Sequence, residues 1–195
     1  YGAEFVELYT KYENEFPDLK RIKARALMSK IIEAQIETGQ PYMLYKDAVN
    51  NKSNQKNIGV IKSSNLCAEI VEYSEKDETA VCNLASIALP KFVTEEGKYD
   101  YQDLYQVAKL ATKNLDQVID INFYPTDKTE NSNSRHRPIG LGIQGLADVF
   151  FKMNIAYDSV QAQMINKQIF ETIYFGALEA SMELASDKGA YSTFK

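Results

Sequence analysis

Residues 63–70 read Ser-Ser-Asn-Leu-Cys-Ala-Glu-Ile, and this stretch decides how the chain is interpreted. In an extended segment, side chains at positions i, i+2 and i+4 point to the same face. Asn65, Cys67 and Glu69 would then share one surface, whereas on a helix Cys67 would point almost opposite to the other two. The extended interpretation therefore predicts that an amide, a sulfur and a general-base candidate lie together.

The second cysteine, Cys82, follows fifteen residues later, and the chain has no third. An isolated cysteine is most often a small buried hydrophobe, which remains the alternative. The carboxylate near Cys67 argues against a thiolate nucleophile, because like charges disfavour double ionisation. It is compatible with one-electron chemistry on a neutral thiol. A hydrolase would need His136, the one histidine, as its base, and nothing else supports this. A disulfide between the two cysteines stays open, while their spacing argues against structural zinc.

The composition is that of an ordinary soluble globular protein, with 45% hydrophobic and 25% charged residues among 195. A net charge of −5 does not favour nucleic acid or an anionic membrane as a partner. No apolar run approaches the roughly 20 residues that span a bilayer, and no signal peptide opens the chain. Two cysteines are too few for a disulfide scaffold, which favours a reducing, cytoplasmic compartment. The first residue is not methionine, so we expect a fragment of a longer protein.

Hydrophobic periodicity predicts an α/β protein in which helices outnumber short extended runs. Predicted helices span residues 20–38, 101–121, 144–153 and 159–187, and a strand is predicted at 41–45. The remaining predictions are loops at 50–59 and 127–137, extended segments with a turn at 60–71, an exposed charged run at 72–78, and an apolar segment of ambiguous type at 79–89.

Two further motifs have ordinary structural interpretations that we favour. Residues 140–145 match the dinucleotide fingerprint G-x-G-x-x-G, but the polar residues 132–138 cannot form the buried strand that must precede it. Glycines that permit a tight turn and close helix packing are the favoured interpretation. The basic run Arg135-His136-Arg137 could bind an anion, although a solvated loop is favoured. We predict no metal site.

At both cysteine segments the chain closely resembles the large, catalytic subunit of class I ribonucleotide reductase, in its eukaryotic-type form. The resemblance extends over essentially all 195 residues and is carried by residues 38–47, 62–73, 80–90, 135–148 and 166–180. It implies that residues 1–195 are part of a ten-stranded α/β barrel with a central catalytic loop. The amino-terminal ATP-binding region and the carboxy-terminal part would lie outside the chain, which alone should be inactive.

The resemblance also implies residue roles. Cys67 matches the thiyl-radical cysteine that abstracts the 3′ hydrogen of the ribose. Glu69 matches the base that takes the 3′-hydroxyl proton, and Asn65 the amide that binds the ribose hydroxyls. Ser64 belongs to the implied substrate-binding set with these three. Cys82 matches one member of the redox-active pair, whose other cysteine lies upstream of this chain.

The resemblance further implies the partners of the complete subunit. They are a ribonucleoside diphosphate substrate, ATP and dNTP effectors, a small subunit with a di-iron or other di-metal radical centre, and thioredoxin or glutaredoxin. The full subunit would form a homodimer, and this segment would bind no cofactor itself. Two alternatives are another thiyl-radical barrel, such as a glycyl-radical enzyme, and a non-catalytic paralogue or interaction module. Loss of Asn65, Cys67 or Glu69 would favour the paralogue, and all three are present.

Overall fold

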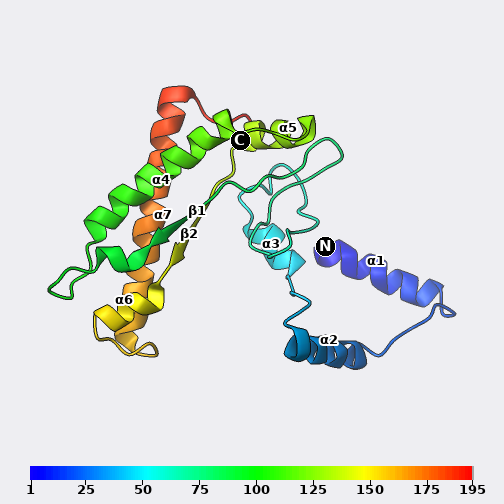
Figure 1. Ribbon diagram of the computed structural model, residues 1–195. Coiled ribbons are helices and arrows are strands. Elements are labelled where there is room, and N and C mark those ends of the chain that lie inside the picture. The colour runs from blue at the N-terminus through cyan, green and yellow to red at the C-terminus, as the bar shows by residue number, and fades with distance from the viewer. Residues whose placement is uncertain (195) are drawn as a thin grey trace. The chain divides into compact units, whose positions relative to one another are not determined.

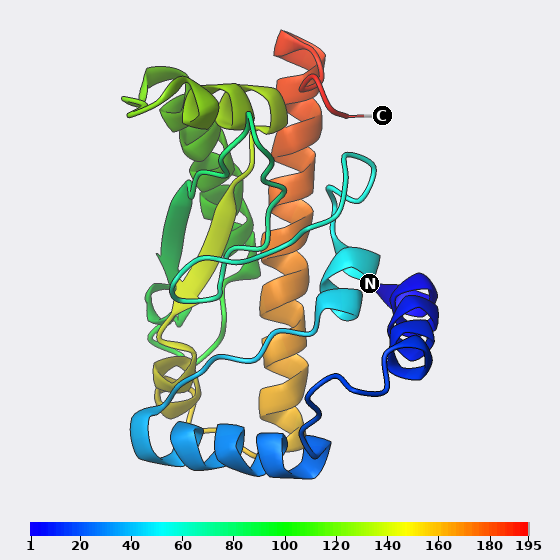
Figure 2. The ribbon, with the colours of Figure 1, turned by 90° about the vertical axis from the view of Figure 1, so that its right-hand side faces the viewer.

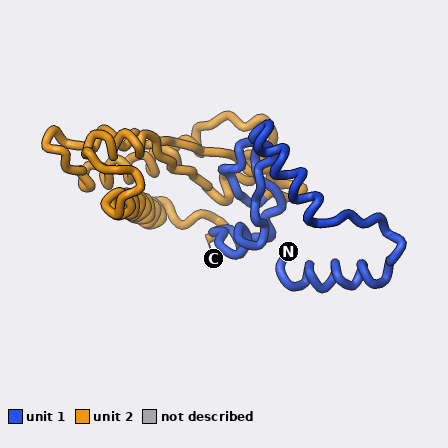
Figure 3. Tube along the Cα trace, turned by 90° about the horizontal axis from the view of Figure 1, so that it is seen from below, with its two compact units in different colours: residues 1–73 blue, residues 74–195 orange. Residues whose placement is uncertain are grey.

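The structure is a computed structural model that describes residues 1–194. The chain divides into two compact units, unit 1 (Tyr1–Tyr73) and unit 2 (Ser74–Lys195), shown in Figure 3. Helices dominate both units, as predicted, and the strands of the described residues form one two-stranded sheet. Within residues 1–194, no helix is both long enough and apolar enough to cross a membrane.

Unit 1 contains three helices, α1 (Gly2–Glu15), α2 (Ala24–Thr38) and α3 (Lys46–Lys52), labelled in Figure 1. The predicted helix at 20–38 corresponds to α2 but begins four residues later. It ends where Gly39 adopts a left-handed conformation, with φ 75°, and donates its amide to Gln35. α1 has no counterpart among the predicted helices.

The predicted strand at 41–45 is wrong. These residues connect α2 to α3 without joining the sheet. An apolar run becomes a strand only where a neighbouring strand takes its backbone hydrogen bonds, and periodicity does not supply that neighbour. The predicted loop at 50–59 begins inside the last turn of α3 and continues as turns.

Unit 2 is built on two parallel strands, β1 (Leu84–Ala88) and β2 (Gly140–Gln144), which lie side by side in Figure 2. Their register pairs Leu84 with Gly140 and Ala88 with Gln144. A Cβ at Gly140 would lie 2.5 Å from the Leu84 side chain, so a glycine is needed for this close pairing. The apolar segment at 79–89, for which the sequence did not decide between helix and strand, therefore contains a strand, β1. The other elements of unit 2 are η1 (Leu89–Phe92), α4 (Tyr101–Ile121), α5 (Asp127–His136), α6 (Leu146–Lys152) and α7 (Val160–Lys188).

The core of unit 2 lies where α4 and α7 pack on each other and on β1 (Figure 1). The prediction of a helix at 101–121 is confirmed in full by α4, which Asp100 caps by accepting the Asp103 amide at 2.9 Å. α7 confirms the predicted helix at 159–187 to within one residue at each end. The fully buried core side chains include Leu89, Leu104, Ala108, Val149 and Ile169.

The predicted loop at 127–137 is wrong, because residues 127–136 form α5. A capping box between Thr126 and Thr129 starts this helix although it lacks apolar periodicity. Acidic residues in its first turn and basic residues in its last turn also favour it through the helix dipole. Arg137 ends α5 in the left-handed region, with φ 45°.

The glycine motif at 140–145 supports packing and not dinucleotide binding. Gly140 and Gly142 lie inside β2, whereas the fingerprint requires glycines in the loop between strand and helix. Gly145 caps α6 with φ 80°, and a Cβ there would lie 2.7 Å from Pro90. The helix predicted at 144–153 therefore begins at Leu146.

The packing of α4 against α7 at Gly176 can be tested. A Cβ at Gly176 would lie 3.0 Å from the Tyr105 carbonyl oxygen, so Gly176→Leu should force the two helices apart. Overpacking typically costs about 1–3 kcal/mol. Hydrogen–deuterium exchange of α4 and α7 in the complete subunit should report faster opening of both helices. Lys167→Leu places the same side chain on an exposed position of α7 and is the control; equal exchange in both variants would contradict this packing.

Candidate active site

The segment that carries Cys67 is held at both ends by side-chain amides of unit 1. Asn50, which is 3% exposed, accepts the Ile61 amide at 2.8 Å and donates to the Ile61 carbonyl at 3.1 Å. Gln55 accepts the Tyr73 amide at 2.7 Å. The paired bonds to Ile61 replace those a neighbouring strand would make. Residues 61–73 therefore have fixed ends without belonging to a sheet.

Between these anchors the chain makes a tight turn over residues 65–68. The Ala68 amide donates to the Asn65 carbonyl at 3.1 Å, and Ala68 has a left-handed φ of 66°. The predicted turn within residues 60–71 is thus confirmed, but continuous alternation from Asn65 to Glu69 is wrong. The turn interrupts the period of two on which that alternation depends. Cys67 lies within the turn and is exposed.

The turn brings Asn65 and Glu69 together by a different route from the predicted one. Nδ2 of Asn65 donates to Oε1 of Glu69 at 2.7 Å, and Oδ1 of Asn65 accepts the Ile70 amide at 3.0 Å. Ser64 donates its hydroxyl to the Ile70 carbonyl. An amide and a carboxylate are thereby fixed on either side of the cysteine. This arrangement can bind hydroxyl groups and accept a proton beside a thiol.

A small pocket borders this turn within unit 1. It includes two of the residues singled out from the sequence, Ser64 and Asn65, and the segment that precedes α3. The complete lining consists of Gln40, Pro41, Tyr42, Leu44, Ser64, Asn65, Leu66 and Ala68. Tyr42 and Leu44 come from the stretch predicted as a strand. Their place beside Asn65 is a feature that sequence reasoning missed, since residues more than 20 positions apart carry no local signal.

Cys82 belongs to unit 2, where it lies exposed two residues before β1. Cys67 belongs to unit 1, so each cysteine has its own local setting. The prediction that Cys82 pairs with an upstream cysteine outside this chain stays a prediction. Its neighbour Asn83 is 4% exposed and makes several side-chain hydrogen bonds.

The basic run is neither a solvated loop nor an anion site, because each of its residues contacts a carboxylate. Arg135 pairs with Glu78, and Nε2 of His136 lies 2.7 Å from the same carboxylate. Nδ1 of His136 lies 3.0 Å from the Thr193 hydroxyl. Burial lowers the pKa of His136, and the charge of Arg135 acts in the same direction. With both ring nitrogens engaged here, the hydrolase alternative gains no support.

Arg137 completes the basic run with a second set of carboxylates. Its Nε donates to Asp116 at 2.6 Å and its Nη1 to Asp120 at 2.7 Å, both on α4. Burial would raise the pKa of Asp116, but hydrogen bonds from Arg137 and Lys188 outweigh it and lower that pKa. These contacts tie the end of α5 to α4 and α7.

The predicted exposed run at 72–78 is wrong at its two ends. Glu78 is 7% exposed because it receives Arg135 and His136. Glu72 is partly buried, and burial raises its pKa to about 7. This burial of Glu72 is a feature that a charged run in the sequence does not reveal.

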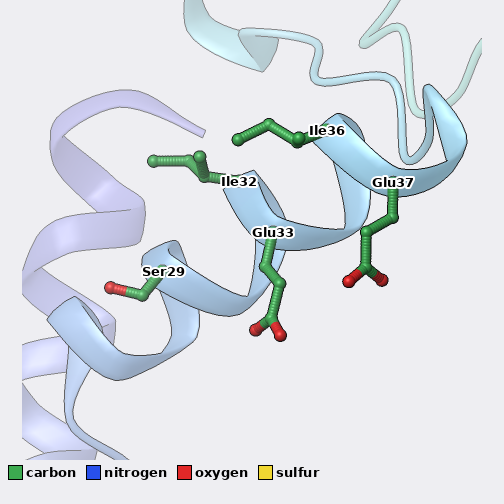
Figure 4. A pocket seen from close by; sticks show the side chains of 5 residues that line it. All are labelled: Ser29, Ile32, Glu33, Ile36 and Glu37. Atoms are coloured by element: carbon green, nitrogen blue, oxygen red, sulfur yellow. The ribbon is translucent and has the colours of Figure 1, made fainter.

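A second pocket of unit 1 lies on α2 and contains none of the predicted site residues. Figure 4 shows Ile32 and Ile36 pointing to one side of the helix and Glu33 and Glu37 to another, with Ser29 completing the lining. Both isoleucines are largely exposed. This pocket is an open surface of α2.

The chain is similar to known proteins along its whole length. The family model described as "Ribonucleotide reductase, barrel domain" matches residues 1–195. The ribonucleoside-diphosphate reductase large subunit of Danio rerio is 58% identical over 194 residues, covering 100% of this chain and 24% of that protein. The ribonucleoside-diphosphate reductase large chain 2 of Saccharomyces cerevisiae is 58% identical over 200 residues, covering 100% of this chain and 23% of that protein.

A solved structure is similar as well. The Actinobacillus ureae class Id ribonucleotide reductase alpha subunit matches with a TM-score of 0.72 and 31% identity, over 87% of this chain and 33% of that one. The chain spans about a quarter of the length of the curated relatives it matches. Because the family model covers every residue, the chain belongs to the ribonucleotide reductase family and lies within its barrel domain.

Proposed function

We propose that this chain is part of the catalytic subunit that reduces ribonucleoside diphosphates to 2′-deoxyribonucleoside diphosphates for DNA precursor synthesis. The observation that carries the proposal is the turn at 65–68. It presents the Cys67 thiol to the outside while Asn65 holds the Glu69 carboxylate at 2.7 Å. Relatives that this chain matches from end to end are named ribonucleoside-diphosphate reductase large subunits.

The proposed chemistry begins at Cys67. Its sulfur, oxidised by one electron to a thiyl radical, takes the 3′ hydrogen of the ribose and becomes a thiol again. Glu69 accepts the 3′-hydroxyl proton, which lets the 2′ hydroxyl leave as water. Asn65 supports this step because its amide can bind a ribose hydroxyl and orient the carboxylate at once. Ser64 stiffens the turn by bonding the Ile70 carbonyl and borders the pocket beside it.

Cys82 is proposed to supply the reducing equivalents. Together with a second thiol from the complete subunit, it gives up two electrons and two protons and becomes a disulfide. The ribonucleotide takes them up, exchanging its 2′ hydroxyl for hydrogen and releasing water. Thioredoxin or glutaredoxin would then reduce the disulfide. This cycle requires a reducing compartment, for which we propose the cytoplasm.

The rest of the proposal concerns the complete subunit. Residues 1–195 would form part of the catalytic barrel domain, with ATP and dNTP effectors bound elsewhere on the subunit. A small subunit with a di-iron or other di-metal centre would generate the radical that reaches Cys67. The full subunit would act as a homodimer. In this arrangement residues 1–195 alone would be inactive.

The first prediction concerns Cys67. In the complete subunit, Cys67→Ser should abolish nucleotide reduction while substrate affinity stays largely intact, because a hydroxyl is not oxidised to a radical as readily as a thiol. Product formation and equilibrium binding of a ribonucleoside diphosphate measure the two effects. Ser63→Ala, at an exposed position of the same segment, should stay active. Appreciable turnover by the Cys67→Ser subunit would remove Cys67 from the mechanism. Inactivity of the unaltered subunit would favour a non-catalytic paralogue.

The second prediction separates the two carboxyl groups of the segment. General-base assistance is typically worth about 10²–10⁴-fold in rate, so Glu69→Gln should slow the chemical step by that factor. Glu72→Gln removes a carboxyl three residues further on and should have a much smaller effect. Single-turnover product formation with a pre-reduced subunit measures both. A loss below about tenfold in the Glu69→Gln subunit would contradict its role as the base.

The third prediction concerns the redox pair. After turnover without external reductant, peptide mapping should find Cys82 linked to an upstream cysteine of the complete subunit, and Cys67 still a thiol. A disulfide requires Cα atoms within about 7 Å, and we expect Cys67 and Cys82 to lie farther apart. Cys82→Ser should permit at most one turnover and then stall. A Cys67–Cys82 linkage would show that the division into radical thiol and reductant thiol is wrong.

A further inference from the structure

Asn83, the residue after Cys82, is anchored by hydrogen bonds of both its backbone and its side chain. The Asn83 carbonyl accepts the Gly140 amide at 2.8 Å, which extends the β1–β2 pairing by one residue toward Cys82. The Asn83 side chain, almost fully buried, donates from Nδ2 to Oδ1 of Asn133 at 2.6 Å and to the Pro138 carbonyl at 2.9 Å. Cys82 itself is exposed.

Asn83 and Asn133 form a reciprocal amide pair in which each amide hydrogen has an acceptor. Nδ2 of Asn133 donates to Oδ1 of Asn83 at 3.3 Å and to the Tyr124 hydroxyl at 2.6 Å. Nδ2 of Asn83 uses its two hydrogens on Asn133 and Pro138. Rotating either amide by 180° would set N–H groups against N–H groups. Asn133 is 0% exposed, so water cannot replace a lost partner, and the pair has one satisfied arrangement.

Tyr124 links this pair to the core of unit 2. Its hydroxyl accepts from Asn133 and donates to the Ile119 carbonyl at 2.7 Å, and Ile119 is 2% exposed on α4. Asn133 lies on α5 and Pro138 just before β2. Groups from α4, α5 and β2 therefore hold the backbone beside Cys82 together. Burying the polar side chains among them would be costly without these hydrogen bonds.

We propose that Asn83, Asn133 and Tyr124 are positioning residues for the redox chemistry of Cys82. This inference rests on the proposed function, in which Cys82 alternates between thiol and disulfide. A disulfide forms without strain only when the two Cα atoms and their Cβ directions meet narrow limits. Because the Cys82 thiol is exposed, its position is set by the backbone that carries it. The amide pair fixes that backbone one residue away. The network keeps Cys82 where its partner sulfur can reach it in every cycle.

The test compares network variants with a buried control in the complete subunit. Asn133→Ala removes the centre of the network, and Tyr124→Phe removes only its outer link while keeping the ring. Thr112→Val is the control: Thr112 is 3% exposed on α4 and donates its hydroxyl to the Ala108 carbonyl, away from Asn83 and Asn133. For each subunit we would measure thermal unfolding, substrate affinity, the single-turnover rate after pre-reduction, and the midpoint potential of the Cys82 disulfide in glutathione buffers.

We expect both network variants to bind substrate within about twofold of the unaltered subunit, since they touch no proposed substrate-binding residue. Misplacing a reacting group by about 1 Å can cost about 10²-fold, so we expect the single-turnover rate to fall by about tenfold or more. The disulfide should also become easier to reduce, by about 30 mV for each tenfold fall in its equilibrium constant. Thr112→Val should lower the unfolding temperature without moving the potential.

Two results would overturn the proposal, and they are distinguishable. If Asn133→Ala and Tyr124→Phe change the rate and the potential no more than Thr112→Val does, the network has only a structural role. If Cys82→Ser leaves repeated turnover intact in the otherwise unaltered subunit, Cys82 has no redox role. In that case the assignment in the proposed function fails and the positioning role fails with it. Should Asn133→Ala not fold, Tyr124→Phe alone decides between these results, because it keeps the ring in the core and removes the hydrogen bond at 2.6 Å that orients the Asn133 amide.

Discussion

The parallel pairing of β1 with β2 is the interaction on which unit 2 depends. Parallel strands need a crossover connection, and α4 and α5 supply it between Ala88 and Gly140. The glycine at 140 lets β2 approach the Leu84 side chain, and the pairing continues one residue beyond β1 through Asn83. The strand pair therefore forms one side of the core and fixes the position of Cys82. A change at this pairing would therefore act directly on the backbone beside Cys82.

Unit 1 holds the segment that carries Cys67 in place without a sheet. Its site segment is held by Asn50 and Gln55, whose amides bond to backbone groups as a strand would. Between these anchors the left-handed Ala68 closes the turn, and Asn65 and Glu69 meet across it. The two candidate cysteines thus share one design. Each is exposed, and each lies within two residues of an asparagine whose side chain makes several hydrogen bonds.

Local sequence signals predicted the features that local forces determine. α4 has apolar residues at helical spacing and an aspartate cap, and its bounds were predicted in full. α5 lacks an apolar face, so periodicity missed it, although Thr126 and Thr129 form a capping box that a search for caps could have found. Strand alternation predicted that Asn65 and Glu69 share one face, but it did not predict their hydrogen bond, because alternation cannot foresee a left-handed residue at Ala68. Burial of Glu78 by Arg135 and His136 spans more than 50 positions and has no local signal at all.

The surface of unit 2 shows why the residues of this chain need the rest of a barrel. α7 buries Ile165, Ile169 and Ile173 on one side but also exposes Phe170, Tyr174 and Phe175 on others. A group of exposed large apolar side chains is typical of a surface that another part of a protein covers. Parallel strands are likewise covered on both faces in α/β proteins, yet Leu84 of β1 is 50% exposed. Relatives about four times as long as this chain supply the additional sequence that such burial requires. The exposed side chains of α7 and β1 are therefore the places where further sequence of such a barrel domain would cover unit 2.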